Sequence, residues 1–346
     1  MATIVVVGAT GVTGRRLVAA LDEAGHEVVP ARSDADDRRA VVGIADLVMV
    51  AARDPQVRGD WLAAAAEFGA HGLDAGADAA VADRAFDDLG APARAAGVTL
   101  VPAAGAGVGD LLAATAAGAV RSPDEVHVCW AFPDRGGWRR ALAPGFRATA
   151  AARLAAPMPV RYDGRRGHER IAEIRRLAWF PKPIGPTHAA AVPGPEPVTV
   201  PVHTPGVGLV RSYLALPTWR AEWLQATGGL LRSGRWRDLV ARRLEQGDAP
   251  TTGAQAARWA CVAESRGDDG VARAWAYGRD PVGLGVAGLV AMAGAVLDGR
   301  AAAGVVPAAE VDAPSTLLDT LSVTAGLRWA VARPTSGATG GGTDAR

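Results

Sequence analysis

The sequence predicts an α/β fold with a doubly wound parallel sheet of the Rossmann type, followed by a second α+β domain built on a mixed or antiparallel sheet. Short apolar runs alternate with helical segments over residues 1–125, which is the pattern of βαβ units. A glycine-rich turn follows the first apolar run directly, where folds of this type bind phosphate groups. From about residue 126 the apolar runs become typical of hairpins, which indicates a second kind of sheet.

The apolar runs of the first region predict strands at 3–7, 27–31, 46–51, 71–74 and 98–101. Helical periodicity predicts helices at 12–24, 57–69, 80–96 and 109–120. Only about 13 residues separate the second strand from the third, which is too few for a full helix–strand–helix crossover. We therefore expect one strand of the usual fold to be missing or reduced, leaving one end of the ligand cleft open.

Residues 4–14, IVVVGATGVTG, are the most informative segment of the chain. The first glycine of such a turn permits a tight bend, the second lets backbone approach a pyrophosphate, and the third lets the helix pack on the strand. The free N–H groups at the helix start then face the phosphate. We expect a dinucleotide site here; the alternative is a Rossmann-type fold that has lost its nucleotide. The expected contacts come from Gly8, Thr10, Gly11, Val12, Thr13 and Gly14.

Residues at the ends of the next two strands bear on the choice of cofactor. Arg32 and Ser33 end the second strand, where an arginine can pair with a 2′-phosphate. We therefore expect NADPH rather than NADH, with Arg15 as a second phosphate ligand. Small residues at the end of the third strand would let a cofactor ribose approach. The further cofactor-binding residues predicted at this edge are Ala51, Ala52, Arg53 and Gly105.

The second domain is predicted to span 126–279. We expect strands at 125–131, 159–163, 198–204 and 209–216, a helix at 142–156, one or two helices within 218–246, and a hairpin formed by 258–264 and 271–278. The segments 283–297 and 315–331 resume an α/β pattern, so we expect them to return to the first domain. That domain would then comprise 1–125 plus about 280–333, followed by a polar, disordered tail at 334–346.

Composition excludes several classes of function. The chain has 346 residues, a net charge of +1 and 49% hydrophobic residues, so nothing indicates a nucleic-acid or membrane-surface partner. The apolar run 281–298 contains four glycines and is short for a bilayer, which favours a buried helix. Cys129 and Cys261 lack metal-ligand spacing, and we expect no metal site. No signal peptide fits the N-terminus, so we expect a cytoplasmic protein, with a homodimer as an open possibility.

Several motifs in order resemble the saccharopine dehydrogenase-like reductases, a family that includes trans-acting enoyl reductases. The motifs are GATGVTG at 8–14, HGLDAGAD at 71–78, TLVPAAGAGVGDLLAA at 99–114, WFPKPIGP at 179–186, GRDPVGLGV at 278–286 and AGVVPAAEV at 303–311. Val282 stands where the family usually has Tyr. The resemblance implies an NADPH-dependent oxidoreductase that transfers a hydride to a C=C, C=N or C=O bond in a biosynthetic pathway.

Local patterns do not identify a proton donor. The Tyr-x-x-x-Lys pair of classical short-chain reductases is absent, because each tyrosine is followed four residues later by Arg or Pro. His188, His203 and Tyr213 of the second domain are the candidate catalytic residues. Asp74 ends a strand and is either a polar contact in the cleft or a cap of the next turn, and Asp110 is most simply a helix cap.

The expected substrate is an apolar or aromatic small molecule, because nine of the ten tryptophans follow residue 129. Two alternatives stay open. A saccharopine-like amino-acid dehydrogenase would need clustered cations for carboxylates, which Arg135, Arg139 and Arg140 could provide. A Rossmann-fold protein without redox function would act as a binding protein or as a non-redox biosynthetic enzyme.

Overall fold

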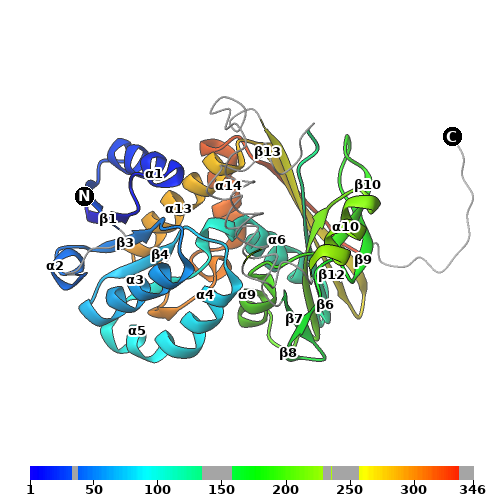
Figure 1. Ribbon diagram of the computed structural model, residues 1–346, viewed down its shortest axis with the longest axis horizontal. Helices are drawn as coiled ribbons and strands as arrows, with labels where there is room; N and C mark the ends of the chain where they lie inside the picture. The colour runs from blue at the N-terminus through cyan, green and yellow to red at the C-terminus, as the bar shows by residue number, and fades with distance from the viewer. Residues whose placement is uncertain (33–37, 135–157, 229–234, 236–256, 335–346) are drawn as a thin grey trace, which may run out of the picture.

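The computed structural model describes residues 1–32, 38–134, 158–228, 235 and 257–334. Figure 1 shows two sheets, one at each end of the molecule, with helices α6, α13 and α14 between them. Residues 3–117 build the first sheet and its helices, together with one short strand, Gly304–Val305, from near the end of the chain. The second sheet takes strands from the middle and from the end of the chain.

In the part of the chain that the structure describes, the first sheet has six parallel strands in the order β14–β5–β4–β3–β1–β2. The strands are β1 (Thr3–Val7), β2 (Glu27–Ala31), β3 (Leu47–Val50), β4 (His71–Asp74), β5 (Thr99–Val101) and β14 (Gly304–Val305). The helices that follow them are α1 (Val12–Glu23), α2 (Arg38–Val42), α3 (Pro55–Phe68), α4 (Ala79–Arg84), α5 (Gly90–Ala96) and α6 (Gly107–Ala117). The predicted helix 80–96 is interrupted by a π-helical turn, η1 (Ala85–Leu89), and a 3₁₀ turn, η2 (Ala104–Ala106), precedes α6.

The sheet order places the reversal of winding at β1, since β2 lies on one side of it and β3 on the other. Strand β2 forms the edge of the described sheet. In an open α/β sheet the ligand crevice lies at the carboxyl ends of the strands at this reversal. The expected ligand site is therefore at the ends of β1 and β3.

Strand β1 is apolar throughout because both of its faces are covered. Ile4 and Val6 pack in the cluster formed with α1, α6, α13 and α14, whereas Val5 and Val7 pack on the opposite face against Trp61 of α3. Successive side chains of a strand point to opposite faces, so a strand buried on both sides reads as one continuous apolar run.

The described part of the second sheet has nine strands. Seven follow the order β15–β13–β12–β6–β11–β10–β9, and β7 and β8 join through β11. Their bounds are β6 (Glu125–Ala131), β7 (Met158–Tyr162), β8 (Arg165–Glu169), β9 (Arg175–Trp179), β10 (Pro186–Ala191), β11 (Leu209–Ala215), β12 (Arg258–Gly267), β13 (Gly270–Arg279) and β15 (Arg328–Ala332). The remaining helices are α9 (Glu196–His203), α10 (Thr218–Gly228), α13 (Pro281–Leu297) and α14 (Pro314–Thr324), with a 3₁₀ turn η4 (Ala308–Glu310).

Helix α13 contains the whole of the predicted segment 283–297 and packs along α1 and α14. Asp280 caps α13 by accepting a hydrogen bond from the Gly283 N–H (2.9 Å), and Pro281 occupies the first turn, where its missing N–H costs nothing. The helix is apolar on most of its surface because neighbouring helices surround it. The apolar run 281–298 is thus a buried helix, and none of the helices described is long and apolar enough to cross a membrane.

Two expectations for the second half of the chain are wrong. The segment predicted as a strand at 198–204 is not one: residues 198–203 lie in α9 and Thr204 is its C-cap, because Pro197 occupies the first helical turn and Pro201 has no N–H for a strand ladder. Within 315–331, α14 packs on α13 and α6, but β15 pairs with β13 in the second sheet rather than returning to the first. The predicted helix 142–156 and nearly all of the tail 334–346 lie outside the described residues.

Candidate active site

The glycine turn between β1 and α1 has the geometry that its sequence predicts. Gly8 has a φ of +79°, and a Cβ there would lie 3.0 Å from the Ala51 carbonyl group. A Cβ at Gly14 would overlap the Gly8 carbonyl oxygen. Gly8 therefore permits the bend beside β3, and Gly14 permits α1 to pack closely on the turn.

The start of α1 is open to a ligand. Gly11 is the N-cap, where it supplies no side-chain hydrogen bond, and the first turn contains no acidic residue. A Cβ at Gly11 would meet only the Gly8 carbonyl oxygen, at 3.4 Å. Thr10, Gly11 and Val12 are exposed, and Val12 is 41% exposed although it is apolar. An uncapped helix start with an exposed glycine is a suitable site for an anion such as a phosphate.

Two arginines follow the glycine turn and have different roles. Arg15 donates to the Thr10 carbonyl oxygen (2.5 Å), so its side chain lies over the turn. Arg16 forms a two-point ion pair with Asp280 (3.0 and 2.5 Å), the residue that caps α13. Arg15 is thus placed beside the expected phosphate site, and Arg16 fixes α1 to α13.

The other predicted cofactor residues lie along the same edge of the sheet. Arg32 is exposed directly after β2, and Ser33 lies outside the described residues. Ala51, Ala52 and Arg53 follow β3, beside Gly8. Gly105 lies against the loop after β4, where a Cβ would overlap the Ala75 carbonyl oxygen. The fold therefore brings the predicted residues that are described to the carboxyl edge of the first sheet.

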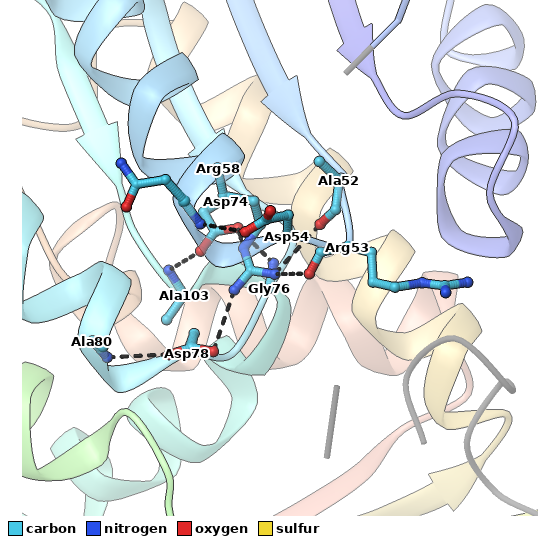
Figure 2. Close-up of polar contacts among 10 residues, drawn as sticks. Ala52, Arg53, Asp54, Arg58, Asp74, Gly76, Asp78, Ala80 and Ala103 are labelled. Carbon is cyan, nitrogen blue, oxygen red and sulfur yellow. Dashed lines mark hydrogen bonds and ion pairs between the residues drawn. The ribbon is translucent and has the colours of Figure 1, made fainter. Parts of the chain in front are cut away.

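A buried charged cluster holds the loops at this edge together (Figure 2). Arg58 of α3 lies 3.0 Å from the Asp74 carboxylate and 3.5 Å from that of Asp78, and it donates to the carbonyl oxygens of Ala52 (3.4 Å) and Arg53 (3.2 Å). The Arg53 side chain itself extends away from the cluster (Figure 2). Arg58 thus fixes the backbone after β3 while leaving the Arg53 guanidinium on the surface.

Asp74 supports the backbone of this edge rather than facing a ligand. It is fully buried and accepts hydrogen bonds from the N–H groups of Gly76 (2.8 Å) and Ala103 (3.3 Å). Of the two roles considered from the sequence, the structure favours the turn contact.

A cavity of about 260 Å³ lies between this edge and the second sheet. The first wall is formed by α1, the loops after β4 and β5, and α13, and the second by β6, β11, α10 and the segment before α9. Its lining is mostly apolar and includes Thr13, Ala75, Gly105, Val282, Leu289, Trp130, Phe132, Pro193, Ser212 and Leu214. A second hollow, of about 650 Å³, lies at the end of the second sheet around Lys182 and Arg328 and does not include the glycine turn.

A carboxyl group that the sequence analysis missed, Glu196, lines the first cavity. Glu196 is 1% exposed, and the Ser212 hydroxyl donates a hydrogen bond to it (2.5 Å). Burial raises its pKa above the ordinary value, and the nearby Asp110 carboxylate adds to the rise. Its sequence context, PGPEPV, is that of a loop, so no local pattern indicated a buried acid there.

Of the three candidate proton donors, Tyr213 is among the described residues that line this cavity, whereas His188 and His203 are not. His188 is exposed on β10. The Tyr213 ring packs edge-on against His127 (5.6 Å between ring centroids), on the sheet face opposite Ser212, and its burial raises its pKa. His203 is buried and lies 3.1 Å from Asp110.

The Asp110–His203 pair is a buried ion pair that connects α6 to α9. Burial alone would lower the pKa of His203, but the Asp110 charge outweighs it and raises that pKa. Burial alone would raise the pKa of Asp110, but His203 and the hydrogen bond from the Ala309 N–H (2.9 Å) lower it. Neither side chain lines the cavity between the sheets. The pair therefore stabilises the packing of α6 against α9 rather than facing a ligand.

Few tryptophans line the cavity. Trp130 does, and its ring lies 5.8 Å from that of the buried Trp259. Trp179, Trp219 and Trp223 are more than half exposed. Trp138 and Trp236 lie outside the described residues, as do the three arginines 135, 139 and 140. Among the described side chains, no group of His, Cys, Asp and Glu is arranged to hold a metal ion.

Comparisons with known proteins agree with this architecture. No protein-family model matches the sequence, and no curated protein matches it. Among solved structures, apo saccharopine dehydrogenase (L-Glu forming) from Saccharomyces cerevisiae is similar, with 12% identity and a TM-score of 0.61 over 96% of this chain and 100% of that one.

Two other solved structures are more distant. The WlbA dehydrogenase from Thermus thermophilus, in complex with NAD and UDP-GlcNAcA, has 11% identity and a TM-score of 0.35 over 94% of this chain and 95% of that one. An oxidoreductase domain protein from Kribbella flavida has 13% identity and a TM-score of 0.32, over 80% and 68%. TM-scores this low support no argument, and an identity of 12% shows the fold alone. The predicted likeness to saccharopine dehydrogenase is thus confirmed as a likeness of fold.

Proposed function

We propose that the chain is an oxidoreductase that uses NADPH to transfer a hydride to a C=C, C=N or C=O bond of an apolar or aromatic small molecule, in a biosynthetic pathway. The observation that carries this proposal is the position of the cavity. Thr13 of the glycine-rich segment and Gly105 line the same space as Trp130 and Phe132 of the second sheet. One wall belongs to the expected cofactor site and the other is suited to a substrate.

The residues at the first wall fit a dinucleotide. The uncapped start of α1, the absence of an acidic residue in its first turn and the space at Gly11 all favour a pyrophosphate. We assign cofactor contacts to Gly8, Gly11 and Thr13, with the ribose and nicotinamide near residues 51–53. A bound reduced nicotinamide supplies the hydride. Arg32 after β2 supports NADPH over NADH, because an arginine pairs well with a 2′-phosphate.

The lining supports a neutral substrate rather than an amino acid. Among the described residues that line it, Glu196 carries the only carboxyl group, and there is no Arg, Lys or His. A substrate carboxylate would be buried there without a cation, which is costly. Val282, at the position where the resembling family usually has Tyr, lines this cavity and adds apolar surface. These features favour an apolar acceptor over the amino-acid substrate of the alternative function.

Titration with NADPH and NADH, followed by tryptophan fluorescence, tests the cofactor assignment, since Trp130 lies in the cavity. We expect NADPH to bind more tightly. Gly11→Val should lower the melting temperature only slightly and weaken binding more than tenfold, because a Cβ there meets only the Gly8 carbonyl oxygen, at 3.4 Å, whereas the side chain fills the pyrophosphate position. The matched control is Gly288→Ala, where a Cβ meets nothing within 4 Å.

Turnover is then measured as the loss of NADPH absorbance with cyclohexenone, 2-phenylpyrroline and acetophenone, which represent the three acceptor bonds. Reduction of one of these supports the proposed reaction and identifies the bond. If neither cofactor changes the fluorescence or the melting temperature, the chain is a Rossmann-fold protein without redox function and the proposal is wrong.

A further inference from the structure

Glu196 has a position that the proposed reaction leaves unused. It is the first residue of α9 and lines the cavity from the side of the second sheet. A buried carboxyl group in an otherwise apolar cavity is costly unless it is protonated or paired. No ion pair joins Glu196 to a cation within the described part of the chain. A buried carboxyl group without a cation partner therefore indicates a functional role for Glu196.

The packing around Glu196 is built for a side chain of this size. A Cβ at Gly109 of α6 would lie 2.7 Å from its Oε1 atom, and a Cβ at Gly194 would overlap its Oε2 atom and the Ser212 hydroxyl. Two glycines thus make the space for the carboxyl group. The Ser212 hydroxyl donates to Oε2 at 2.5 Å, and the Trp130 indole also hydrogen-bonds to the carboxyl group. The side chain is held in one place from three elements.

The charges that face Glu196 favour its neutral form. Burial raises its pKa most, and the Asp110 carboxylate of α6 raises it further, whereas the hydrogen bonds from Ser212 and Trp130 oppose the rise. His203 does not offset this effect, because it is paired with Asp110. Cys261 of β12 is a neutral neighbour, since burial raises the pKa of its thiol. A carboxyl group kept protonated near neutral pH can act as an acid.

We propose that Glu196 is the catalytic acid that protonates the substrate during reduction, and that the site takes a neutral acceptor with a hydrogen-bond-accepting atom directed at this residue. This inference rests on the proposed function. As the hydride bonds to one carbon of the acceptor, the π-electron pair moves to the other end of the reduced system. That end takes the proton as the carboxyl O–H bond of Glu196 breaks. The resulting carboxylate accepts the Ser212 hydrogen bond and is reprotonated from solvent before the next turnover.

The decisive variant is Glu196→Gln, which has the same size and therefore fits between Gly109 and Gly194. We expect it to bind NADPH within threefold of the parent chain and to lose at least a hundredfold in turnover, the lower range of general acid catalysis. Glu196→Asp should retain part of the rate. The parent rate should fall as pH rises through the pKa of Glu196, because the acid form is required, and the glutamine variant should lack this step. Glu67→Gln, an exposed change on α3, is the control.

Two readouts do not depend on turnover. Acetophenone affinity should fall as pH rises in the parent chain and stay constant in Glu196→Gln, because only a protonated carboxyl donates to the ketone. The melting temperature of Glu196→Gln relative to the parent should rise with pH: the folded-state pKa is raised, so the parent loses stability as pH increases.

The results separate this inference from the proposed function. Absence of NADPH binding by the parent chain overturns both. NADPH binding and turnover with an undiminished rate in Glu196→Gln overturns only the role of Glu196. A melting-temperature difference that does not change with pH, or acetophenone binding that does not depend on pH, also overturns it, because the carboxyl group is then not held in its acid form.

Discussion

Replacement of Arg58 by methionine tests whether the cluster in Figure 2 holds the carboxyl edge of the first sheet together. Arg58 is 2% exposed and Asp74 is fully buried, so the change removes a buried cation and leaves a buried carboxylate. Methionine fills part of the volume of the Arg58 side chain and replaces its aliphatic portion with a similar apolar chain. The measured effect then reports mainly on the lost charge and hydrogen bonds.

The magnitude follows from the distances. The contact with Asp74 (3.0 Å) is a close ion pair without hydrogen-bond geometry, and the Arg53 carbonyl accepts a hydrogen bond (3.2 Å), whereas the contacts with Asp78 (3.5 Å) and Ala52 (3.4 Å) are long and contribute less. Breaking a buried ion pair costs about 3–5 kcal/mol. The N–H groups of Gly76 and Ala103 still support Asp74, so we expect the lower end, about 3 kcal/mol. At about 1.4 °C per kcal/mol for a chain of 346 residues, the melting temperature should fall by roughly 4 °C.

Thermal unfolding followed by circular dichroism measures this shift. The control is Arg84→Met, because Arg84 is exposed on α4 and bonds to the Gln56 side chain; its shift should be small. Asp74→Asn combined with Arg58→Met should cost less than the sum of the two single changes, because either change already breaks the pair. A shift no larger than that of Arg84→Met, or additive effects of the two changes, would refute the reasoning.

Three further predictions concern separate parts of the site. Gly14→Ala should lower the melting temperature, because its Cβ would overlap the carbonyl oxygen of the turn; an unchanged melting temperature would contradict the packing. Arg32→Ala should weaken NADPH more than NADH in fluorescence titrations, and equal weakening would argue against its contact with a 2′-phosphate. His203→Gln should destabilise most below the ordinary histidine pKa of 6.5 and less as pH rises, because Asp110 raises the pKa of His203 and the stabilisation is lost when the imidazole deprotonates. Melting curves across this pH range measure that effect, and a constant difference would exclude it.

The first sheet could be predicted from the sequence because its signals are local. The strands predicted at 3–7, 27–31 and 71–74 have the observed bounds. Each is a short apolar run followed by a turn, and a parallel strand buried on both faces needs no partner in the sequence pattern to be detected.

The second sheet was predicted less completely because its signals depend on tertiary contacts. Strands β8 and β9, RRGHE and RRLAW, carry many arginines and no regular apolar alternation. Their charges are satisfied across the sheet, as where Arg211 of β11 forms an ion pair with Glu169 of β8. The sequence also did not indicate which sheet β15 joins, because RWAVA fits a strand of either sheet equally well.

The two walls of the candidate site also differ in whether local sequence or tertiary contacts determine them. The glycine turn is local, since Gly8, Gly11 and Gly14 act on one bend and one helix start, so spacing alone predicts it. The acid at the opposite wall is not local. Glu196 becomes a buried acid only because α6 provides Gly109, β11 provides Ser212 and β6 provides Trp130, none of which is close to it in sequence. Burial changes the chemistry of this carboxyl group, so any acid role of residue 196 arises from the tertiary fold rather than from a motif.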